Sequence, residues 1–407
     1  MFWRIICLIT NKLDNCLILI IVGFILIWRN TWLLYINVNN VGFYSSFISV
    51  LPFSLFSASP NVRFFIAPSE SLCFCINLAT AGSLSDIGHI SLKKLLKYFF
   101  LLKHISHVVR EIRPELVYIT PNAGRKAFFK DFIVVQMLKS MGCKVIAHYH
   151  NKGVSVYQSK WVYNFFYKRF FSNLKVILLA ENLYKDMAKY VKREDVYICP
   201  NGIPSSCKEE MEARRNNVIP HLLFLSNLLI SKGVIVLLDA LRILKEKGYL
   251  FNCQYVGGET AEINAVQFSE EVDKRDLNDR VAYVGRKVGE EKNTFFQQAD
   301  IFILPTMNEC FPLVILEAME YKLPVISTNE GGIPDIVKDG ENGLICEKQN
   351  PYSLADCIAK LLDDEELRVK MGNAGYEKFC REFTLQRFES RMLDILSQNL
   401  PQKEKEN

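Results

Sequence analysis

The hydrophobic and polar positions of the chain alternate between short apolar runs and longer amphipathic stretches, most clearly in the second half. Ile301–Leu304 is an apolar run closed by Pro305, and another apolar run at residues 324–327 follows a stretch of helical character that ends near Tyr321. Apolar runs of this length without polar alternation are typical of parallel strands that are buried on both faces. Pro312 is expected at the first helical position, where its fixed φ fits and its missing N–H costs nothing. The pattern therefore predicts a parallel strand–helix–strand unit.

The same alternation covers both halves of the chain. In the first half we predict strands at 62–66, 71–76, 116–119, 144–147, 175–179 and 196–199, and helices at 91–112, 126–141, 160–171 and 181–190. In the second half we predict further strands at 221–225, 252–256 and 281–284, and helices at 232–247, 261–273, 290–298, 354–362, 364–376 and 384–399. Strands and helices that alternate in this way predict an α/β fold with two doubly wound, Rossmann-like domains.

The domain borders follow from composition. Residues 61–204 form the predicted first domain, the polar stretch 205–219 reads as a linker, and residues 220–383 form the second domain. A helix at 384–400 and a disordered tail at 401–407, rich in lysine and glutamate, complete the chain. Ligands of doubly wound sheets bind at the carboxyl ends of the strands, so two facing domains are expected to enclose a cleft.

Residues 1–60 admit two interpretations. Residues 16–28 form an apolar run of thirteen residues, and Arg29 separates it from a second apolar run at 31–36. A helix needs roughly twenty residues to span a bilayer, a length that this segment reaches only with the arginine inside it. A membrane anchor and a first strand region therefore both remain open. No small-residue cleavage site follows, which disfavours secretion.

Composition narrows the class of protein. The chain of 407 residues is long enough for two or three domains, and its 50% of hydrophobic residues can build sizeable cores. The formal net charge of +5 is mild for this length and gives no argument for a nucleic-acid partner. The twelve cysteines include no Cys-x-x-Cys pair, and the six histidines show no metal-ligand spacing. We therefore expect reduced thiols in a cytosolic protein and no metal site.

Two glutamates flank the start of the predicted helix that follows Pro312. Glu309 lies in the loop before this helix and Glu317 lies inside it, about one and a half turns from its start. A helix start favours an anion, but two carboxylates beside it would repel a bare phosphate. Carboxylates accept hydrogen bonds from vicinal hydroxyl groups, as acidic residues do on a nucleotide ribose, and we assign the pair to that task. On spacing alone, two solvated glutamates on a helix that only packs remain the alternative.

The stretch around these glutamates resembles the donor-site signature of the retaining glycosyltransferase family 4. The matching residues are Glu309, Pro312, Glu317, Ala318, Met319, Pro324, Gly331, Gly332, Asp335 and the run from Glu341 to Leu344. The resemblance implies a fold of the GT-B type and transfer of a sugar from a nucleotide-diphosphate sugar, with retention of configuration and without a metal ion. The absence of an Asp-x-Asp motif agrees with this expectation, because that motif forms the metal clamp of the other major glycosyltransferase fold.

The resemblance also implies roles for individual residues. Glu317 is expected to bind the ribose and Glu309, as a catalytic residue, the sugar hydroxyls. The diphosphate is expected to contact Lys232 and the helix start, which comprises Phe311, Pro312, Leu313 and Val314. A surface lysine is the alternative for Lys232 taken by itself.

Three further features of the second half belong to the predicted donor site. Asn227 stands where similar proteins carry a second cation, so Lys232 acts with helix dipoles or another cation such as Arg286 substitutes. Gly257 and Gly258 follow a strand and resemble the turn near base and phosphate, with an ordinary strand-end turn as the alternative. Gly331 and Gly332 are expected to let backbone N–H groups approach the ligand closely.

In the first half, His148 and His150 are the candidate site residues. Both follow or end a predicted strand, where a histidine can orient or polarise the acceptor or the transferred sugar. The resemblance assigns the catalytic role to His150 and leaves His148 structural. The first half departs from the family in lacking a glycine-rich loop near its start. The second half departs from it at Cys310 and Lys322, where glycine is usual, and at Asp335, where glutamate is more common.

We therefore expect a hexosyltransferase-type enzyme that uses a nucleotide sugar, with no cofactor, and a saccharide or lipid-linked acceptor in surface polysaccharide or glycan synthesis. A nucleotide-sugar epimerase of similar fold and a degenerate, non-catalytic sugar-nucleotide-binding protein are the alternatives. The basic, apolar helices at 91–112 and 160–171 either pack in the first domain or rest on an anionic membrane, and packing is the favoured interpretation. We expect a cytoplasmic protein, with the inner face of the membrane as an optional contact.

Overall fold

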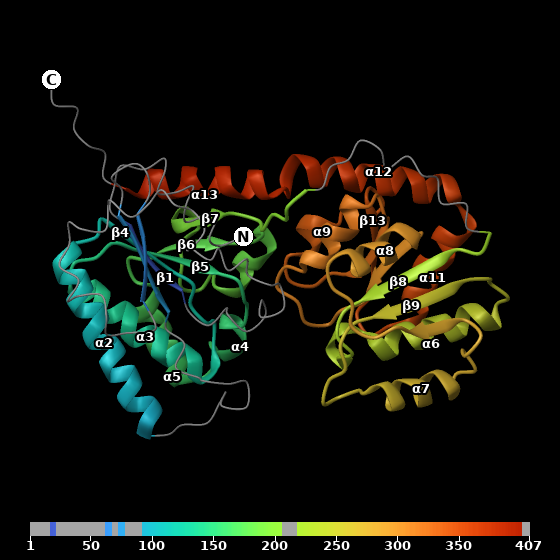
Figure 1. Ribbon diagram of the computed structural model, residues 1–407, viewed down its shortest axis with the longest axis horizontal. Coiled ribbons are helices and arrows are strands. Elements are labelled where there is room, and N and C mark those ends of the chain that lie inside the picture. Colours follow the sequence, from blue (N-terminus) through green and yellow to red (C-terminus); the bar gives the residue numbers. More distant parts are fainter. Residues whose placement is uncertain (1–16, 22–61, 67–71, 78–91, 206–217, 401–407) are drawn as a thin grey trace, which may run out of the picture. The chain divides into compact units, whose positions relative to one another are not determined.

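The computed structural model describes residues 17–21, 62–66, 72–77, 92–205 and 218–400, which form two compact units (Figure 1). The first unit comprises the described residues up to Ile177, the segment Ala188–Tyr197 and the chain from Ile395 onward. The second unit comprises Leu178–Met187 and Ile198–Asp394. Each unit contains one β-sheet covered by helices, so the predicted α/β class with two Rossmann-like domains is confirmed.

The first unit contains, within the described residues, a seven-stranded sheet in the order β2-β3-β1-β4-β5-β6-β7. Strand β1 pairs in parallel with β3 and β4, β4 pairs in parallel with β5, and β2 runs antiparallel to β3 at the edge. The strands are β1 (Leu17–Ile21), β2 (Val62–Ile66), β3 (Leu72–Asn77), β4 (Leu116–Ile119), β5 (Val145–Tyr149), β6 (Lys175–Leu178) and β7 (Val196–Ile198). Strands β4 and β5 are buried along their whole length, as their continuous apolar runs predict.

Strand β1 falls within the N-terminal segment for which an anchor and a strand were both open. Residues 16 and 22–36 of that segment lie outside the described residues, as do most of the predicted linker (206–217) and the tail (401–407). None of the helices in the described parts of the chain combines the length and the hydropathy needed to span a bilayer.

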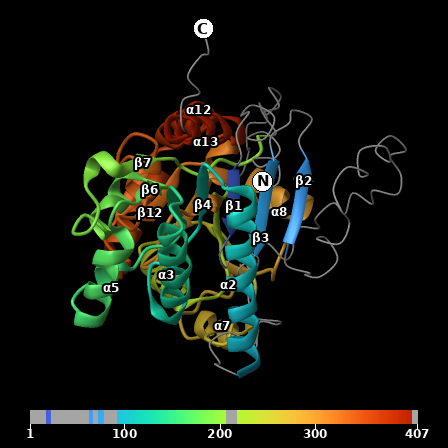
Figure 2. The same cartoon turned by 90° about the vertical axis from the view of Figure 1, so that its left-hand side faces the viewer.

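Helices α2 (Leu92–Ile112), α3 (Arg125–Ser140) and α5 (Trp161–Phe171) lie side by side over one face of the first sheet (Figure 2). The short helix α4 (Val154–Tyr157) precedes α5, and two 3-10 turns, η6 (Glu181–Asp186) and η7 (Arg193–Asp195), flank the last strand. The helix predicted at 181–190 is instead the 3-10 helix η6, which ends at Asp186. The carboxylate of Asp335 accepts hydrogen bonds from the N–H groups of Glu181 and Asn182, and this short turn already buries Leu183.

Helix α2 packs only in part, which corrects the expectation of a fully packed helix. Its second half buries Leu101, Ile105, Val108 and Val109, at the spacing of one helical face. Its first half exposes its large apolar side chains instead, with Leu92 at 74% and Phe99 at 52% exposure.

The second unit contains, within the described residues, a six-stranded sheet in the order β10-β9-β8-β11-β12-β13, and all of its strand pairs are parallel. The strands are β8 (His221–Leu225), β9 (Asn252–Val256), β10 (Val281–Tyr283), β11 (Ile301–Leu304), β12 (Val325–Thr328) and β13 (Gly343–Cys346). Counted from β8, this is the strand order 3-2-1-4-5-6 of dinucleotide-binding sheets. The order reverses between β8 and β11, and sheets of this type bind ligands at the carboxyl end of that junction.

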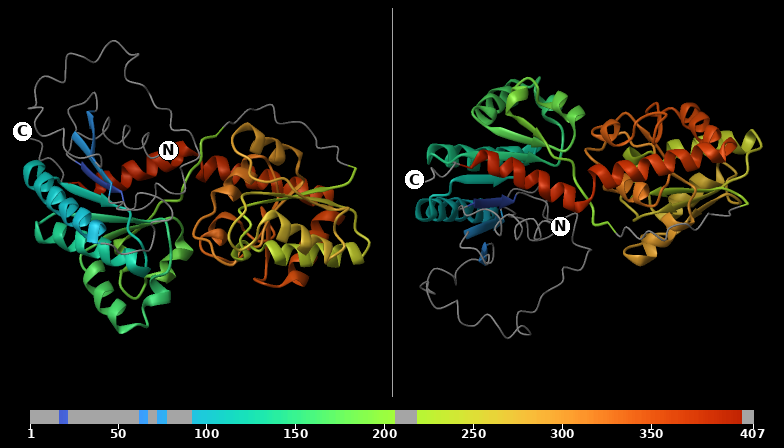
Figure 3. Two further views of the ribbon diagram at one scale, coloured as in Figure 1. Left: turned by 60° about the horizontal axis from the view of Figure 1, so that its bottom comes forward. Right: turned by 90° about the horizontal axis from the view of Figure 1, so that it is seen from above.

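Helices cover both faces of the second sheet (Figure 3). They are α6 (Val234–Glu246), α7 (Ala265–Asp273), α8 (Glu290–Gln298), α9 (Leu313–Glu320), α10 (Ile333–Ile336), α11 (Pro351–Asp363) and α12 (Glu365–Glu382), with a 3-10 turn η8 (Ile230–Lys232) before α6. The last helix, α13 (Leu385–Asn399), belongs to the second unit up to Asp394 and to the first unit from Ile395. Helix α6 packs against α7 and α11, and α12 packs against α9. The predicted strand–helix–strand unit is β11–α9–β12, and its parallel pairing is confirmed.

Several helix starts differ from the prediction for local reasons. Helix α6 begins at Val234, because Gly233 takes a left-handed φ of 84° that ends the preceding turn. Helix α7 begins at Ala265, because Asn264 and Gln267 form a reciprocal capping box there. Pro312 is the residue before α9 and has ψ 111°, so its predicted place as the first helical residue is wrong by one position. Strand β13, only four residues long, was missed.

Candidate active site

Two loops meet at the carboxyl end of the junction between β8 and β11. The loop after β11 is held against the loop after β8 because the Met307 N–H and the Thr306 hydroxyl both donate hydrogen bonds to the carbonyl of Ser231, at 2.8 and 3.1 Å. A Cβ on Gly233 would lie 2.2 Å from the carbonyl oxygen of Pro305, so only glycine permits this approach. The sequence thus brings the two predicted donor-binding segments together.

Lys232 and Glu309 form an ion pair across these loops. Their side chains are 18% and 22% exposed, so the pair is shielded but reachable from solvent. Lys232 Nζ also lies 3.5 Å from the carbonyl oxygen of Asn308, and the N–H of Cys310 donates to Glu309 Oε2 at 3.3 Å. Lys232, expected at the diphosphate, and Glu309, expected at the sugar, are therefore adjacent, and their opposite charges neutralise each other.

Glu317 forms a second ion pair, with Lys292 of the neighbouring helix α8. Lys292 Nζ lies 2.8 Å from Glu317 Oε1, and the two side chains are 23% and 26% exposed. The sequence analysis missed Lys292, which belongs to no motif and stands among glutamates in the stretch EEKNTFF. Only the packing of α8 beside α9 identifies it.

The start of α9 provides a positive helix end beside Glu309. Phe311 and Pro312 are buried, and Leu313 and Val314, the first two helical residues, are half-buried. The first N–H groups of a helix have no partner within it, so this start favours a negative charge. This arrangement agrees with the place expected for residues 311–314, although contact with a ligand stays a prediction.

Asn227, in the loop after β8, contacts the turn that Gly257 and Gly258 form after β9. The N–H of Gly258 donates to Asn227 Oδ1 at 3.1 Å, so Asn227 orders this turn. A Cβ on Gly257 would lie 1.8 Å from the carbonyl oxygen of Ser226. Arg286 is exposed, and its Cδ would lie 3.9 Å from a Cβ on Gly258. Arg286, the alternative considered for the missing cation, thus lies next to the turn of Gly257 and Gly258.

Gly331 and Gly332 approach the backbone of the Glu309 loop. The N–H of Gly332 donates to the carbonyl of Cys310 at 2.7 Å, and a Cβ on Gly331 would lie 2.2 Å from the carbonyl oxygen of Glu309. Gly331 has a left-handed φ of 55°. Within this structure the glycines therefore fix the loop that carries Glu309, and their expected contact with a ligand stays a prediction.

The departures from the family pattern at Cys310 and Lys322 differ in their structural effect. Lys322 has a φ of 55°, a conformation that favours glycine, and so carries backbone strain. Cys310 has no positive φ, and its backbone accommodates a side chain. Cys310 therefore does not distort the loop that holds Glu309.

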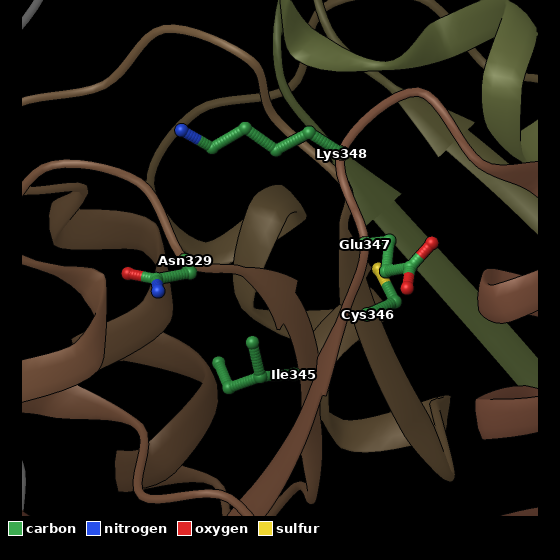
Figure 4. Close-up of a pocket in the computed structure, with 5 residues that line it drawn as sticks. All are labelled: Asn329, Ile345, Cys346, Glu347 and Lys348. Atoms are coloured by element: carbon green, nitrogen blue, oxygen red, sulfur yellow. The ribbon is translucent and has the colours of Figure 1, made fainter.

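A shallow pocket of about 450 Å³ lies beside β13 and is lined by Asn329, Ile345, Cys346, Glu347 and Lys348 (Figure 4). In the figure Lys348 extends to the same side as Asn329, whereas Glu347 points the opposite way. Lys348 forms an ion pair with Glu330, which is buried. The residues that line this pocket include neither Lys232 nor Glu309.

His150 lies directly after β5 in the first unit, beside His148. The two rings are 4.1 Å apart between centroids, and the hydroxyl of Tyr118 is 2.7 Å from His148 Nδ1. Burial lowers the pKa of His150 to about 4 and, together with the neighbouring His150, lowers the pKa of His148 further below its ordinary value. Both rings are therefore neutral at physiological pH.

The loop that carries His150 is tied to the loop after β4. Asn151 Oδ1 accepts a hydrogen bond from the N–H of Ala123 at 2.7 Å, and its Nδ2 donates to the carbonyl of Pro121 at 3.1 Å. His150 is thus held at the carboxyl end of the first sheet, where the sequence placed it.

Comparison with known proteins identifies the second unit. The sequence model described as "Glycosyl transferases group 1" matches residues 208–378, which include β8 to β13 and every residue of the two ion pairs. This part of the chain is a group 1 glycosyltransferase domain. The match includes the donor-site residues that the resemblance to family 4 singled out, whereas His150 lies outside it.

Curated relatives share parts of the chain. An uncharacterized glycosyltransferase of Methanocaldococcus jannaschii is 34% identical over 40% of this chain and 43% of its own length. The capsular polysaccharide biosynthesis glycosyltransferase CapM of Staphylococcus aureus is 32% identical over 38% of this chain and 40% of its own length. The amylovoran biosynthesis glycosyltransferase AmsK of Erwinia amylovora is 26% identical over 64% of this chain and 68% of its own length. The chain thus spans less than half the length of the first two relatives.

Solved structures are similar over most of the chain. Sucrose-phosphate synthase of Thermosynechococcus elongatus superposes with a TM-score of 0.63 at 20% identity, over 84% of this chain and 86% of its own. HepE of Anabaena, in complex with UDP, superposes with a TM-score of 0.61 at 17% identity, over 80% of this chain and 86% of its own. These likenesses extend beyond the group 1 domain and confirm the predicted GT-B class of fold.

Proposed function

We propose that this chain is a retaining, metal-independent glycosyltransferase that moves a sugar from a nucleotide-diphosphate sugar to a saccharide or lipid-linked acceptor. The observation that carries the proposal is the Lys232–Glu309 ion pair at the junction between β8 and β11, where sheets of this order bind nucleotides. The UDP bound to HepE supports the donor class, and the polysaccharide pathways for which CapM and AmsK are named support the pathway class.

In this proposal the donor diphosphate takes over Lys232 from Glu309. The ammonium of Lys232 and the start of α9 then stabilise the negative charge that develops on the leaving diphosphate. Release from Lys232 lets the carboxylate of Glu309 accept hydrogen bonds from the sugar hydroxyls. One ion pair thus supplies both groups that the donor needs.

Glu317 binds the ribose in this proposal. Hydrogen bonds to a charged group contribute about 1.5–3 kcal/mol, so Glu317→Ala should weaken donor binding about tenfold to a hundredfold. Isothermal titration with the preferred nucleoside diphosphate measures this loss. Unchanged affinity in a folded variant would remove the ribose assignment.

The acceptor belongs to the first unit in this proposal, and His150 is the residue that contacts it or the transferred sugar. Its neutral ring can donate from one nitrogen and accept at the other, which suits a hydroxyl group. This role does not require a charged imidazole.

The decisive experiment is a panel of nucleotide sugars screened for thermal stabilisation of the full chain, since a ligand that binds only the folded state raises the melting temperature. The stabilising donor is then incubated with saccharide and lipid-linked acceptors, with and without a chelator, and the anomeric configuration of the product is read by NMR. We expect transfer with retention that is insensitive to the chelator. Conversion of the donor without any acceptor would instead indicate an epimerase, and binding without transfer to any acceptor would indicate a non-catalytic sugar-nucleotide-binding protein.

A membrane surface is the partner that we propose for the first unit. Between Leu92 and Phe171 the sequence carries fifteen lysine and arginine residues and three acidic ones. Large apolar side chains on the same helices are exposed, among them Phe99 at 52% and Phe100 at 64% on α2, and Trp161 at 80% and Phe165 at 50% on α5. Exposed aromatic groups among cations are typical of a surface that rests on anionic lipid, where a lipid-linked acceptor would be found.

Flotation with vesicles tests this partner. Wild-type protein should bind vesicles that contain phosphatidylglycerol, and binding should weaken with salt and be lost on vesicles of phosphatidylcholine alone. Trp161→Ser with Phe165→Ser should weaken binding at least about tenfold, because each buried ring contributes about 1.5–3 kcal/mol. Tyr352→Ser, at an exposed position of the second unit, is the matched control. Equal binding of both variants would exclude this surface.

A further inference from the structure

Lys292 contacts a residue of the proposed donor site, Glu317, and no motif explains it. It lies on α8, and its ammonium contacts Glu317 Oε1 at 2.8 Å. Helix α8 is anchored beside α9 by Phe296, which is buried and stacks on Tyr321 with 5.3 Å between ring centroids and an interplanar angle of 11°. Lys292 is therefore held in place by a packed helix and not by a flexible loop.

The surroundings of Glu317 are rich in negative charge. Burial, with the charges of Glu320, Glu290 and Glu317, raises the pKa of the Tyr321 hydroxyl to about 12. Glu290, Glu317 and Glu320 thus all place negative charge near Tyr321, which follows the end of α9. Lys292 is the cation that pairs with Glu317 within this group.

We propose that Lys292 is a positioning residue that fixes the carboxylate of Glu317 for the two hydroxyls of a ribose, and that it thereby sets a preference for ribonucleotide over 2′-deoxyribonucleotide donors. The inference rests on the proposed function. A carboxylate held at one oxygen by an ammonium has a fixed plane, and a vicinal diol requires such a plane because its two hydroxyls donate in fixed directions. Without Lys292, repulsion turns Glu317 away, and the second hydroxyl no longer adds affinity.

The test measures a ratio of affinities, which a merely structural role would not change. The full chain is titrated with UDP, GDP and ADP and with their 2′-deoxy counterparts, for wild type, Lys292→Met and Lys292→Arg. Lys287→Met is the matched control, because Lys287 pairs with the exposed Glu291 at 3.5 Å near the same helix. Lys292→Gln provides the same comparison if the methionine variant is unstable.

We expect wild type to bind its preferred ribonucleotide about tenfold more tightly than the 2′-deoxy form, the strength of one hydrogen bond to a charged group. Lys292→Met should lose most of this ratio through weaker ribonucleotide binding, with 2′-deoxy binding changed less than about twofold. Lys292→Arg should restore the ratio, and Lys287→Met should match wild type. In a Glu317→Gln background the Lys292→Met change should have no further effect.

The outcomes separate this inference from the proposed function. A wild-type ratio that survives in Lys292→Met, or an equal effect of that change in the Glu317→Gln background, overturns the role of Lys292 and leaves the transferase proposal intact. A wild-type protein that binds none of the nucleoside diphosphates overturns the proposed function itself. Equal wild-type binding of ribo and 2′-deoxy forms overturns the ribose assignment and this inference together.

Discussion

In the second unit, the ionisable side chains near the carboxyl ends of the strands form ion pairs with one another, whereas in the first unit they favour uncharged forms. Lys232 and Glu309, and Lys292 and Glu317, are 18–26% exposed. In the first unit, burial lowers the pKa of His150 to about 4, and Asp131, only 1% exposed, has a pKa raised to about 7.

This difference separates two kinds of recognition. A paired charge at a reachable surface can exchange its partner for a charged ligand at little desolvation cost. A neutral imidazole offers hydrogen bonds without charge, which suits the hydroxyl acceptor of the proposed function. We therefore expect the group 1 domain to bind the charged groups of the donor, and the first unit to bind the uncharged hydroxyl group of the acceptor. Three substitutions test this division.

Lys232→Met should have the largest effect. It removes the cation proposed for the leaving diphosphate and leaves the carboxylate of Glu309 without its ion-pair partner, so kcat/KM should fall by about 10²–10³. Steady-state kinetics with the preferred donor measure the loss. The control is Lys247→Met, which removes an exposed lysine paired with Asp356 in the same unit and should leave kcat/KM within about twofold. A loss of less than about threefold in Lys232→Met would break the assignment of charged chemistry to this pair.

His150→Ala should have a smaller effect, about tenfold in kcat, because it removes one neutral hydrogen-bonding group. The pH profile is the sharper measurement. With a pKa of about 4, His150 stays neutral down to that pH, so the acid limb of the wild-type profile should not reflect this ring near pH 6.5. An acid limb near pH 6.5 that disappears in His150→Ala would show a charged imidazole and contradict the comparison.

The same pKa has a consequence for stability. The folded value of about 4 lies below the ordinary value of 6.5, so the unfolded chain takes up the proton first as the pH falls. The contribution of His150 to stability is therefore present above pH 6.5 and is lost as the pH falls toward 4. His148, whose pKa is also lowered by burial, acts in the same direction.

The sequence predicted elements best where pattern and packing coincide. Strands β4 and β11 match their predicted residues because each is a short apolar run that is buried along its whole length. The resemblance to family 4 singled out Lys232, Glu309 and Glu317, and the structure pairs Lys232 with Glu309, while their roles toward a ligand stay predictions. The helix predicted at 181–190 is instead the 3-10 helix η6, and Asp335, which caps its first N–H groups, lies far away in the sequence.

Lys292 shows the limit of spacing arguments. A contact between α8 and α9 depends on how two helices lie on one face of a sheet, and no periodicity along either helix encodes it. The same limit explains the lowered pKa of His150, since its neutral ring follows from the loops after β4 and β5 and not from its neighbours in the sequence.

Asp131→Asn should affect activity least and sharpen the comparison through stability. Asp131 Oδ2 accepts hydrogen bonds from the Asn122 N–H and Nδ2 at 2.7 and 2.9 Å, and an asparagine oxygen can accept the same two. Burial outweighs these bonds and the charge of Lys130 and raises the pKa of Asp131 from 3.8 to about 7. Because the folded value is the higher one, the stabilisation of the wild type is complete below pH 4 and is lost as the pH rises toward 7.

The asparagine variant has no such loss, so its advantage over wild type should grow by roughly 2–3 kcal/mol between pH 5 and pH 8, at about 1.36 kcal/mol per pKa unit. Thermal melts of both proteins at the two pH values measure this growth, and the histidines that the two proteins share cancel in the difference. Asp195→Asn is the control, because Asp195 is half exposed and pairs with Lys175 at 2.6 Å, so its removal should give no advantage that grows with pH. If the advantage of Asp131→Asn does not change with pH, the first unit tolerates the buried charge of Asp131 as readily as the second unit tolerates its ion pairs. The division between the two units would then no longer hold.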